Sequence, residues 1–151
     1  MPKLQSEFLL TIRITLEKLH DFGDTPHGTR HIDMLGEGSF EGPKLRGKVI
    51  GGMDQKIFRS DGAMNPNVRL VLKAEDDALI YMHYTGIRHG SKEVMEKIAK
   101  GEEVDPTEYY LRNTPYFETS ASQYDWLNRI VSVGVGRRMP DHAAYDIFQI
   151  L

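Results

Sequence analysis

Apolar and polar residues alternate along much of this chain with a period of two. Near the N-terminus, Phe8, Leu10, Ile12, Ile14 and Leu16 share one side of the alternation, which predicts a half-buried β-strand and fits a helix poorly. The same pattern predicts further strands over residues 30–34, 55–59, 68–73, 79–85, 130–135 and 143–151. The chain therefore reads as an all-β protein built from short strands.

Glycine and proline interrupt these predicted strands. The segment 21–28 contains two glycines and a proline, and we expect it to form a turn without regular structure. Frequent glycines in strands usually mark bulges or barrel corners, and Gly51 and Gly52 predict another break of this kind. The acidic link 74–77 between two predicted strands is typical of a hairpin turn.

Only residues 91–100 have the pattern of a helix. Ser91 is placed to cap the N-terminus, Val94 and Ile98 fall on one face, and Gly101 is suited to end the helix. A second helical start follows at residues 105–108, and we expect this insertion to cover one barrel mouth. The natural architecture for residues 1–151 is one domain, a single antiparallel β-barrel or sandwich with one short helix.

Composition narrows the classes of function. The net charge of 19 − 22 = −3 argues against a nucleic-acid footprint and against a basic membrane-binding surface. The absence of cysteine excludes disulfides, thiolate nucleophiles and cysteine-bound zinc. We expect no metal and no cofactor, because no histidine or carboxylate spacing matches a ligand set. No apolar run approaches the length of a membrane helix, so we expect a cytoplasmic protein.

The stretch 117–129 concentrates the side chains best suited to chemistry. We expect a strand from Tyr116 to carry Glu118, and a second strand after the corner to place Trp126 and Asn128 on one side and Arg129 on the other. Taken singly, each has a structural alternative, with Trp126 anchoring the core and Arg129 pairing with Glu118 on the surface. Their density favours a pocket.

Four motifs occur in a characteristic order, and together they carry a family resemblance. They are GDTPHGTRHI, GEGSFEGPKLRGKVIGGMDQKIFRSDG, EDDALIYMHYTGIR and RNTPYFETSASQYDWLNRIVSVGVGRR. From about Phe8 to the C-terminus, the chain resembles the family called domain of unknown function thirty-two thirty-seven. The resemblance implies a closed antiparallel β-barrel. It also implies an activity like hydroxylaminobenzoate lyase, which removes ammonia from a hydroxylamino-aromatic acid and leaves a catechol acid.

The resemblance also marks polar positions that are patterned in the family. These positions are Arg30, Asp54, Asp61, Arg69, Tyr81, Glu118, Trp126, Asn128 and Arg129. The chain departs from the family pattern at Ile50, Gln55 and Ala78, where proline, an aromatic residue and glycine are common. Because of these departures, the family's substrate is less safely assigned to this chain than the family's fold.

Two functional hypotheses follow, and a third is less specific. An enzyme of lyase or isomerase type would use Glu118 as acid or base and Asn128 to orient a small aromatic or carboxylated substrate. Arg69 or Arg30 would clamp its carboxylate through paired hydrogen bonds. Trp126 would form a stacking wall, with Asp54, Tyr81 and Arg129 as further substrate-binding residues.

The alternatives use the same barrel differently. A non-catalytic carrier would hold one small apolar ligand in the interior. An interaction module would fill its interior with its own side chains and act through its outer surface. In the first two cases the expected partner is a small molecule, and assembly into a homo-oligomer is left open.

Overall fold

The computed structural model describes residues 1–151, the whole chain. It contains one α-helix, α1 (Lys92–Ala99), and two short 3-10 segments, η1 (Pro106–Glu108) and η2 (Ser122–Arg129). The strands are β1 (Ser6–Ile14), β2 (Leu16–Thr25), β3 (Gly28–Leu35), β4 (Gly38–Glu41), β5 (Arg46–Phe58), β6 (Met64–Asn65), β7 (Asn67–Ala74), β8 (Leu79–Gly90), β9 (Tyr109–Glu118), β10 (Ser132–Arg138) and β11 (Ala143–Ile150). The predicted antiparallel β-fold with one short α-helix is therefore confirmed.

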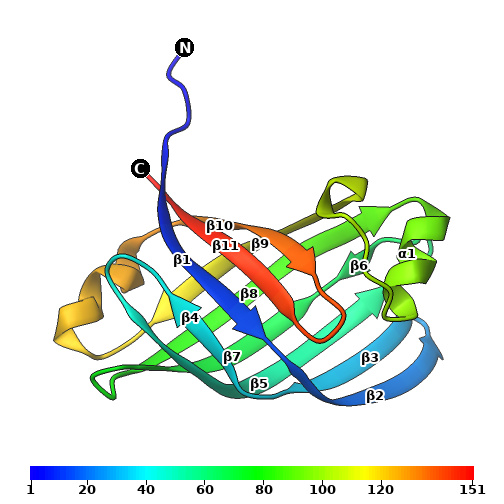
Figure 1. Cartoon of the computed structure of the whole chain (residues 1–151), viewed down its shortest axis with the longest axis horizontal. Helices are drawn as coiled ribbons and strands as arrows, with labels where there is room; N and C mark the ends of the chain where they lie inside the picture. Colours follow the sequence, from blue (N-terminus) through cyan, green and yellow to red (C-terminus); the bar gives the residue numbers. More distant parts are fainter.

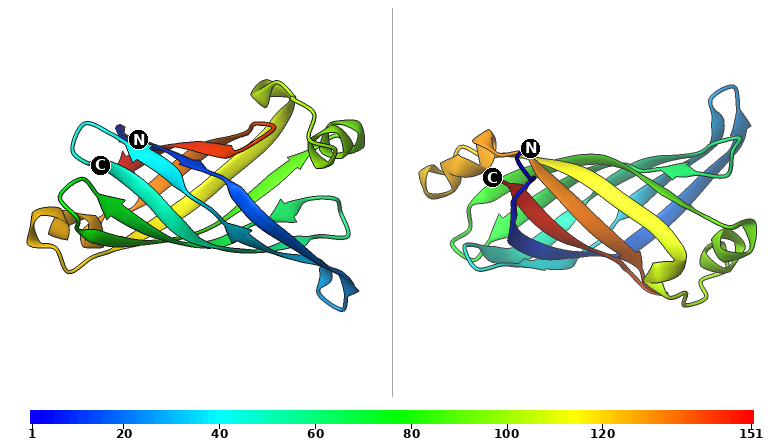
Figure 2. Two further views of the ribbon diagram at one scale, coloured as in Figure 1. Left: turned by 60° about the horizontal axis from the view of Figure 1, so that its bottom comes forward. Right: turned by 90° about the horizontal axis from the view of Figure 1, so that it is seen from above.

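The strand pairings follow a circuit around a barrel-like sheet. From β1 they run through β11, β10, β9, β8, β7, β5 and β4, and β4 pairs with β1 again. β2 and β3 form a hairpin that extends the sheet beyond one end, where β3 pairs with the second half of β5. Figures 1 and 2 show α1 and the tip of this hairpin at one end of the molecule, and η2 at the other.

Side chains that alternate inward along the strands fill the interior. On β7, Val68, Leu70, Leu72 and Ala74 all point inward and are at most 3% exposed. They belong to one cluster of 23 buried residues, which also draws side chains from β1, β5, β8, β9, β11 and α1. Burial of apolar surface on this scale, at about 25 cal/mol per Å², is the main term that holds such a sheet around its core.

The turn predicted over residues 21–28 is shorter than expected, and the break predicted at Gly51 and Gly52 is a bulge within β5. β2 continues through most of segment 21–28 as far as Thr25, and only Pro26 and His27 form the turn. β5 runs through Gly51 and Gly52 without ending. In both strands the irregularity is absorbed by a shift of register, which at β5 coincides with a φ of 154° at Gly51. Here glycine marks a bulge within a strand and does not mark its end.

The predicted helix and its caps are confirmed. Ser91 Oγ accepts a hydrogen bond of 3.2 Å from the backbone N–H of Val94, while Val94 and Ile98 are buried against the core. Gly101 follows the helix with a φ of 78°. The insertion joins the end of β8 to the start of β9, and Figure 1 shows α1 at that end of the sheet.

The second strand predicted after the corner at residues 120–122 is wrong, because this segment is the 3-10 helix η2. Side-chain hydrogen bonds to the backbone explain the difference. Asn128 accepts from the N–H of Thr119 at 2.9 Å and donates back to the Thr119 carbonyl at 2.9 Å. Only Leu127 is buried, so the segment has one anchor and lacks the alternating face that a strand requires.

Candidate functional site

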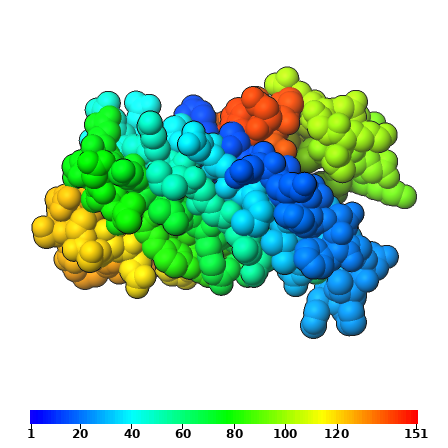
Figure 3. Space-filling model, turned by 90° about the horizontal axis from the view of Figure 1, so that it is seen from below, coloured from blue at the N-terminus to red at the C-terminus, as the bar shows by residue number.

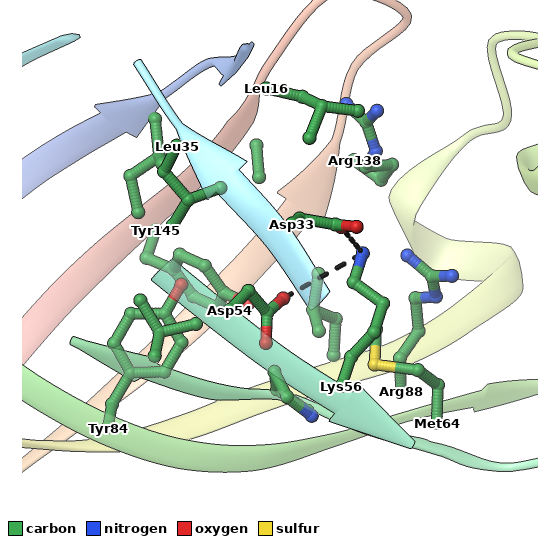
Figure 4. Close-up of a pocket in the computed structure, with 15 residues that line it drawn as sticks. Leu16, Asp33, Leu35, Asp54, Lys56, Met64, Tyr84, Arg88, Arg138 and Tyr145 are labelled. Atoms are coloured by element: carbon green, nitrogen blue, oxygen red, sulfur yellow. Dashed lines mark ion pairs between the residues drawn. The ribbon is translucent and has the colours of Figure 1, made fainter. Parts of the chain in front are cut away.

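A cavity of about 70 Å³ lies inside the sheet at the end near α1 (Figure 4). Although most of its wall is apolar, several of its side chains are charged or phenolic. These are Asp33, Asp54, Lys56, Arg88, Arg138, Tyr84 and Tyr145, contributed by β3, β5, β8, β10 and β11. Buried charges are costly and rare in protein interiors, so their convergence marks this cavity as the candidate site.

Strand register brings the acidic pair together. Asp33 on β3 lies directly opposite Asp54 on β5, and cross-strand partners project from the same face. Lys56, two residues after Asp54, points the same way. Its Nζ is 2.8 Å from Asp33 Oδ2 and 3.7 Å from Asp54 Oδ2 (Figure 4). One largely buried ammonium group is therefore shared by two buried carboxyl groups.

The two carboxyl groups differ in their remaining contacts. Asp54 Oδ1 accepts a 3.0 Å hydrogen bond from the backbone N–H of Asn67, whereas Asp33 Oδ1 is buried without a partner. Burial raises the pKa of Asp54, the positive charge of Lys56 and the Asn67 hydrogen bond oppose that rise, and the nearby charge of Asp33 adds to it. The Asp54 carboxyl therefore takes up a proton more readily than an exposed aspartate does.

Two arginines in the cavity wall have no carboxylate partner. Arg88 is 6% exposed and its Nε is buried without a hydrogen bond. Arg138 donates from Nη1 to the carbonyl of His142 at 2.7 Å and forms no ion pair. Burial lowers the pKa of Arg88 from its very high ordinary value, and a guanidinium still keeps its charge in such a site. These two groups leave an excess of positive charge in the cavity wall.

Tyr84 and Tyr145 form the deeper wall. Their ring centroids are 5.3 Å apart with the planes tilted by 58°. Burial raises the pKa of both phenols, which therefore stay protonated at neutral pH and can donate hydrogen bonds. The cavity thus combines a carboxyl with a raised pKa, an ammonium group, two guanidinium groups without carboxylate partners and two phenol donors.

Among the residues predicted for the site, only Asp54 lies in this cavity. Arg69, Tyr81 and Glu118 are instead brought together on the outside of the sheet, where they line a groove over β5, β7, β8 and β9. All three are exposed. The structure therefore divides the predicted set between an inner and an outer surface.

The other predicted residues lie apart from both surfaces. Arg30 is half-buried and donates from Nη1 to the Gln55 carbonyl at 3.1 Å. Trp126 is half-buried at the η2 end, with Lys44 Nζ 5.1 Å from its ring centroid. The Asn128 side chain is hydrogen-bonded to the backbone of Thr119, as described above. Arg129 Nη1 pairs with Asp125 Oδ2 at 2.6 Å. The structure does not place Trp126, Asn128 and Arg129 in one pocket with Glu118.

Sequence reasoning missed most of the cavity wall. The signal was present in the strand alternation, because Tyr84 and Arg88 fall on the same face of β8 as the buried Ile80 and Met82. Lys56 likewise falls on the face of Asp54. A charged residue on the apolar face of a predicted strand is the pattern that would have found the site.

Comparison with known proteins agrees with the fold. A UPF0311 protein of Rhodopseudomonas palustris is 30% identical over 99% of both chains, and the crystal structure of this protein of unknown function superposes with a TM-score of 0.96. A beta-barrel-like protein of Acinetobacter baumannii is 36% identical, with a TM-score of 0.86 over 100% of this chain and 98% of that one. At 19% identity, an enzyme from Penicillium herquei has a TM-score of 0.75 over 100% and 98% of the two chains, which shows a shared fold.

The fold contains no helix that is both long and apolar enough to span a membrane. Its sequence matches one family pattern across nearly its whole length, from residue 3 to residue 150, and that pattern is described as Protein of unknown function (DUF3237). The order of the four motifs, the barrel-like sheet and the relatives at 30% identity or more agree with this match. The chain belongs to the DUF3237 family.

Proposed function

We propose that the protein is an enzyme that transfers protons on a small anionic substrate, and that the reaction takes place at the cavity around Asp54. The observation that carries this proposal is that a buried carboxyl and two arginines without counter-ions line one cavity. A purely structural cluster would be expected to pair its arginines, because an unpaired buried charge is destabilising.

In this proposal Asp54 is the general acid or base and Lys56 stabilises its ionised form. The raised pKa of Asp54 brings its proton exchange closer to neutral pH, where an acid–base group is most effective. Asp33 holds the other side of Lys56 through the 2.8 Å contact and keeps the ammonium group beside Asp54. Tyr84 and Tyr145 are placed to donate hydrogen bonds to developing negative charge.

Arg88 and Arg138 would bind the anionic group of the substrate, since charge-assisted hydrogen bonds to guanidinium suit a carboxylate. The cavity volume of about 70 Å³ sets the binding mode. An enclosed site for benzene needs on the order of 150 Å³. The anionic end of a substituted benzoate would therefore enter the cavity, while its ring stays at the mouth near Leu16 and Leu35.

The reaction class that we propose is ammonia-lyase chemistry on a hydroxylamino-substituted benzoate. Hydroxylaminobenzoate and water would give the dihydroxybenzoate and ammonia. The N–O bond breaks and its oxygen leaves as water, a water adds to the neighbouring ring carbon, which loses its hydrogen as a proton, and a second water displaces the nitrogen from its own ring carbon as ammonia. One carboxyl that alternates between protonated and ionised forms can deliver a proton to each leaving group and take protons from the ring and the incoming water. The family resemblance suggested the substrate, and the acidic and cationic groups of the cavity are compatible with it.

A matched pair of variants tests where the chemistry occurs. Asp54→Asn and Glu118→Gln each replace a carboxyl by an amide of similar shape, one in the cavity and one in the outer groove. We expect Asp54→Asn to lower turnover of hydroxylamino- and hydroxy-benzoates by about 10²-fold or more, and Glu118→Gln to retain most of it. Ammonia release and absorbance between about pH 5 and 9 provide the readout.

Other results of the same experiment have definite meanings. Loss of turnover in Glu118→Gln alone would move the chemistry to the outer groove, as the sequence first suggested. Binding of these acids by the wild type without any turnover would favour a carrier for this substrate class. The charged and narrow cavity is poorly suited to an apolar ligand, which is why we propose the enzyme.

A further inference from the structure

The outer face of the sheet around β7 and β8 carries apolar side chains that nothing in the molecule covers. Val71, Leu79 and Tyr81 are 46%, 61% and 43% exposed, and Met34 and Met53 border them from β3 and β5. We call these five residues the outer apolar patch. Figure 3 shows this side of the molecule, with atoms of β5, β7 and β8 in teal to green at its centre.

The patch is hollowed as well as apolar. It lines a groove of about 910 Å³, many times larger than the inner cavity. Gly52 lines this groove, and β5 bulges at the neighbouring Gly51. A concave apolar surface of this kind is typical of a site that is covered by another molecule.

Two unpaired charges lie on opposite sides of β8, within and beside the outer apolar patch. Arg69 on β7 lies opposite His83 of β8, while Glu118 on β9 lies opposite Tyr81 of β8. Arg69 donates a 3.1 Å hydrogen bond to Asn67 Oδ1 and has no carboxylate partner, and Glu118 has no cationic partner. A line from Arg69 to Glu118 therefore crosses β8 diagonally, between Tyr81 and His83.

We propose that this face binds a second copy of the chain in a twofold-symmetric dimer, with the symmetry axis passing close to Tyr81. A twofold rotation about an axis that lies in the plane of the interface, perpendicular to the line from Arg69 to Glu118, exchanges the positions of these two residues. Arg69 would meet Glu118 of the partner subunit, and the same pair would form a second time across the axis. One unpaired charge of each sign beside an apolar centre is the self-complementary arrangement that a twofold interface requires.

The expected energetics follow from this arrangement. The apolar patch supplies buried surface, with Tyr81 as its aromatic anchor, and the two ion pairs lie on either side of the symmetry axis. Exposed charges contribute modestly to affinity when paired, but like charges placed opposite one another oppose association strongly. Charge reversal is therefore the most sensitive way to test the interface.

The test measures the mass of the full-length protein by light scattering and sedimentation equilibrium from about 1 to 100 µM. We expect a dimer for the wild type, and at least a tenfold weaker association for both Arg69→Glu and Glu118→Arg. An equimolar mixture of the two variants should recover the dimer. In a mixed dimer, the new acidic side chain at position 69 faces the new basic side chain at position 118, and the unchanged Glu118 faces the unchanged Arg69. Each variant alone would instead place like charges opposite one another. Lys92→Glu, an exposed reversal on α1, serves as the matched control and should remain dimeric.

Each outcome bears on the proposal. A wild-type monomer over the whole concentration range would overturn it, as would a dimer that both reversals leave intact. A mixture that stays monomeric would overturn the pairing of Arg69 with the partner's Glu118. Leu79→Lys, at a position 61% exposed, provides an independent disruption at the apolar centre, and circular dichroism checks that every variant is folded.

Discussion

The inner and outer faces of this sheet both carry acidic and basic groups, but the acidic groups of the cavity are buried and paired, whereas the charged groups of the outer groove are exposed and unpaired. Inside, Asp33 and Asp54 hold Lys56 between them and are less than a tenth exposed. Outside, Arg69 and Glu118 are exposed and lack charged partners. The inner charges were brought together at the cost of desolvation, which suits chemistry, whereas the outer charges are free to meet another molecule.

Removal of the shared inner cation should have the largest effect on stability. Lys56→Met leaves two buried carboxyl groups facing each other without a counter-ion. We expect the free energy of unfolding at pH 7 to fall by about 3 kcal/mol, a loss typical of breaking a buried ion pair. Urea denaturation measures it. A loss below about 0.5 kcal/mol would mean that the inner cluster behaves like a surface pair.

Removal of a cavity arginine should have the next largest effect, on binding. Arg88→Met takes away a guanidinium with a free Nε and should weaken benzoate binding by about 1.5 to 3 kcal/mol, or roughly tenfold to a hundredfold. The matched outer variant is Arg69→Met, for which little change is expected. Calorimetric titration of both variants separates the two faces. If Arg69→Met weakened benzoate binding more than Arg88→Met, the benzoate carboxylate would bind in the outer groove.

Neutralising Asp54 should stabilise the protein modestly. Because its pKa is raised in the folded state, ionisation of Asp54 disfavours folding, and stability is lost as the pH rises from the unfolded pKa to the folded one. Asp54→Asn removes this loss and should increase the free energy of unfolding at pH 7 by about 1 kcal/mol. The advantage should disappear below about pH 4, where the unfolded aspartate is also protonated. Denaturation at about pH 3.5 and about pH 7 gives the comparison.

Removal of an exposed ion pair on the surface should have the smallest effect on stability. Arg46 Nε lies 3.8 Å from Glu75 Oε1, and both side chains are more than half exposed. Arg46→Met should change the free energy of unfolding by no more than about 0.5 kcal/mol. This variant provides the baseline for Lys56→Met, since both replace one cation with the same apolar residue.

The sequence predicted the elements whose stability is local. The strict alternation of β7 and the cap and apolar face of α1 are visible in a few consecutive residues, and both were found within one or two positions. The segment that became η2 was misread because Asn128 bonds the backbone of Thr119, and alternation does not register such a bond. The bulge in β2 was misread as a turn because glycine signals both an irregular strand and its end, whereas Gly51 and Gly52 do mark an irregularity, at the bulge in β5.

The candidate site was harder to predict because it depends on register between distant strands. Asp33 meets Asp54 only because β3 pairs with β5 in one particular register, since a shift of one residue would turn one of the two outward. Arg88 and Arg138 lie on β8 and β10, which are separated in the chain by α1, β9 and η2. Asp54 was identified through the family motif alone, and the residues around it required the structure.

The β2–β3 hairpin has a consequence for how this protein resists aggregation. β2 pairs only with β3, so its other side is a long unsatisfied edge beside an otherwise continuous circuit of pairings, where a strand of another chain could add. Its register shifts twice, between Leu16 and Lys18 and again between Asp21 and Gly23. A strand interrupted in this way cannot offer an unbroken ladder of hydrogen-bonding groups, so the molecule is protected against open-ended, fibre-like growth along this edge.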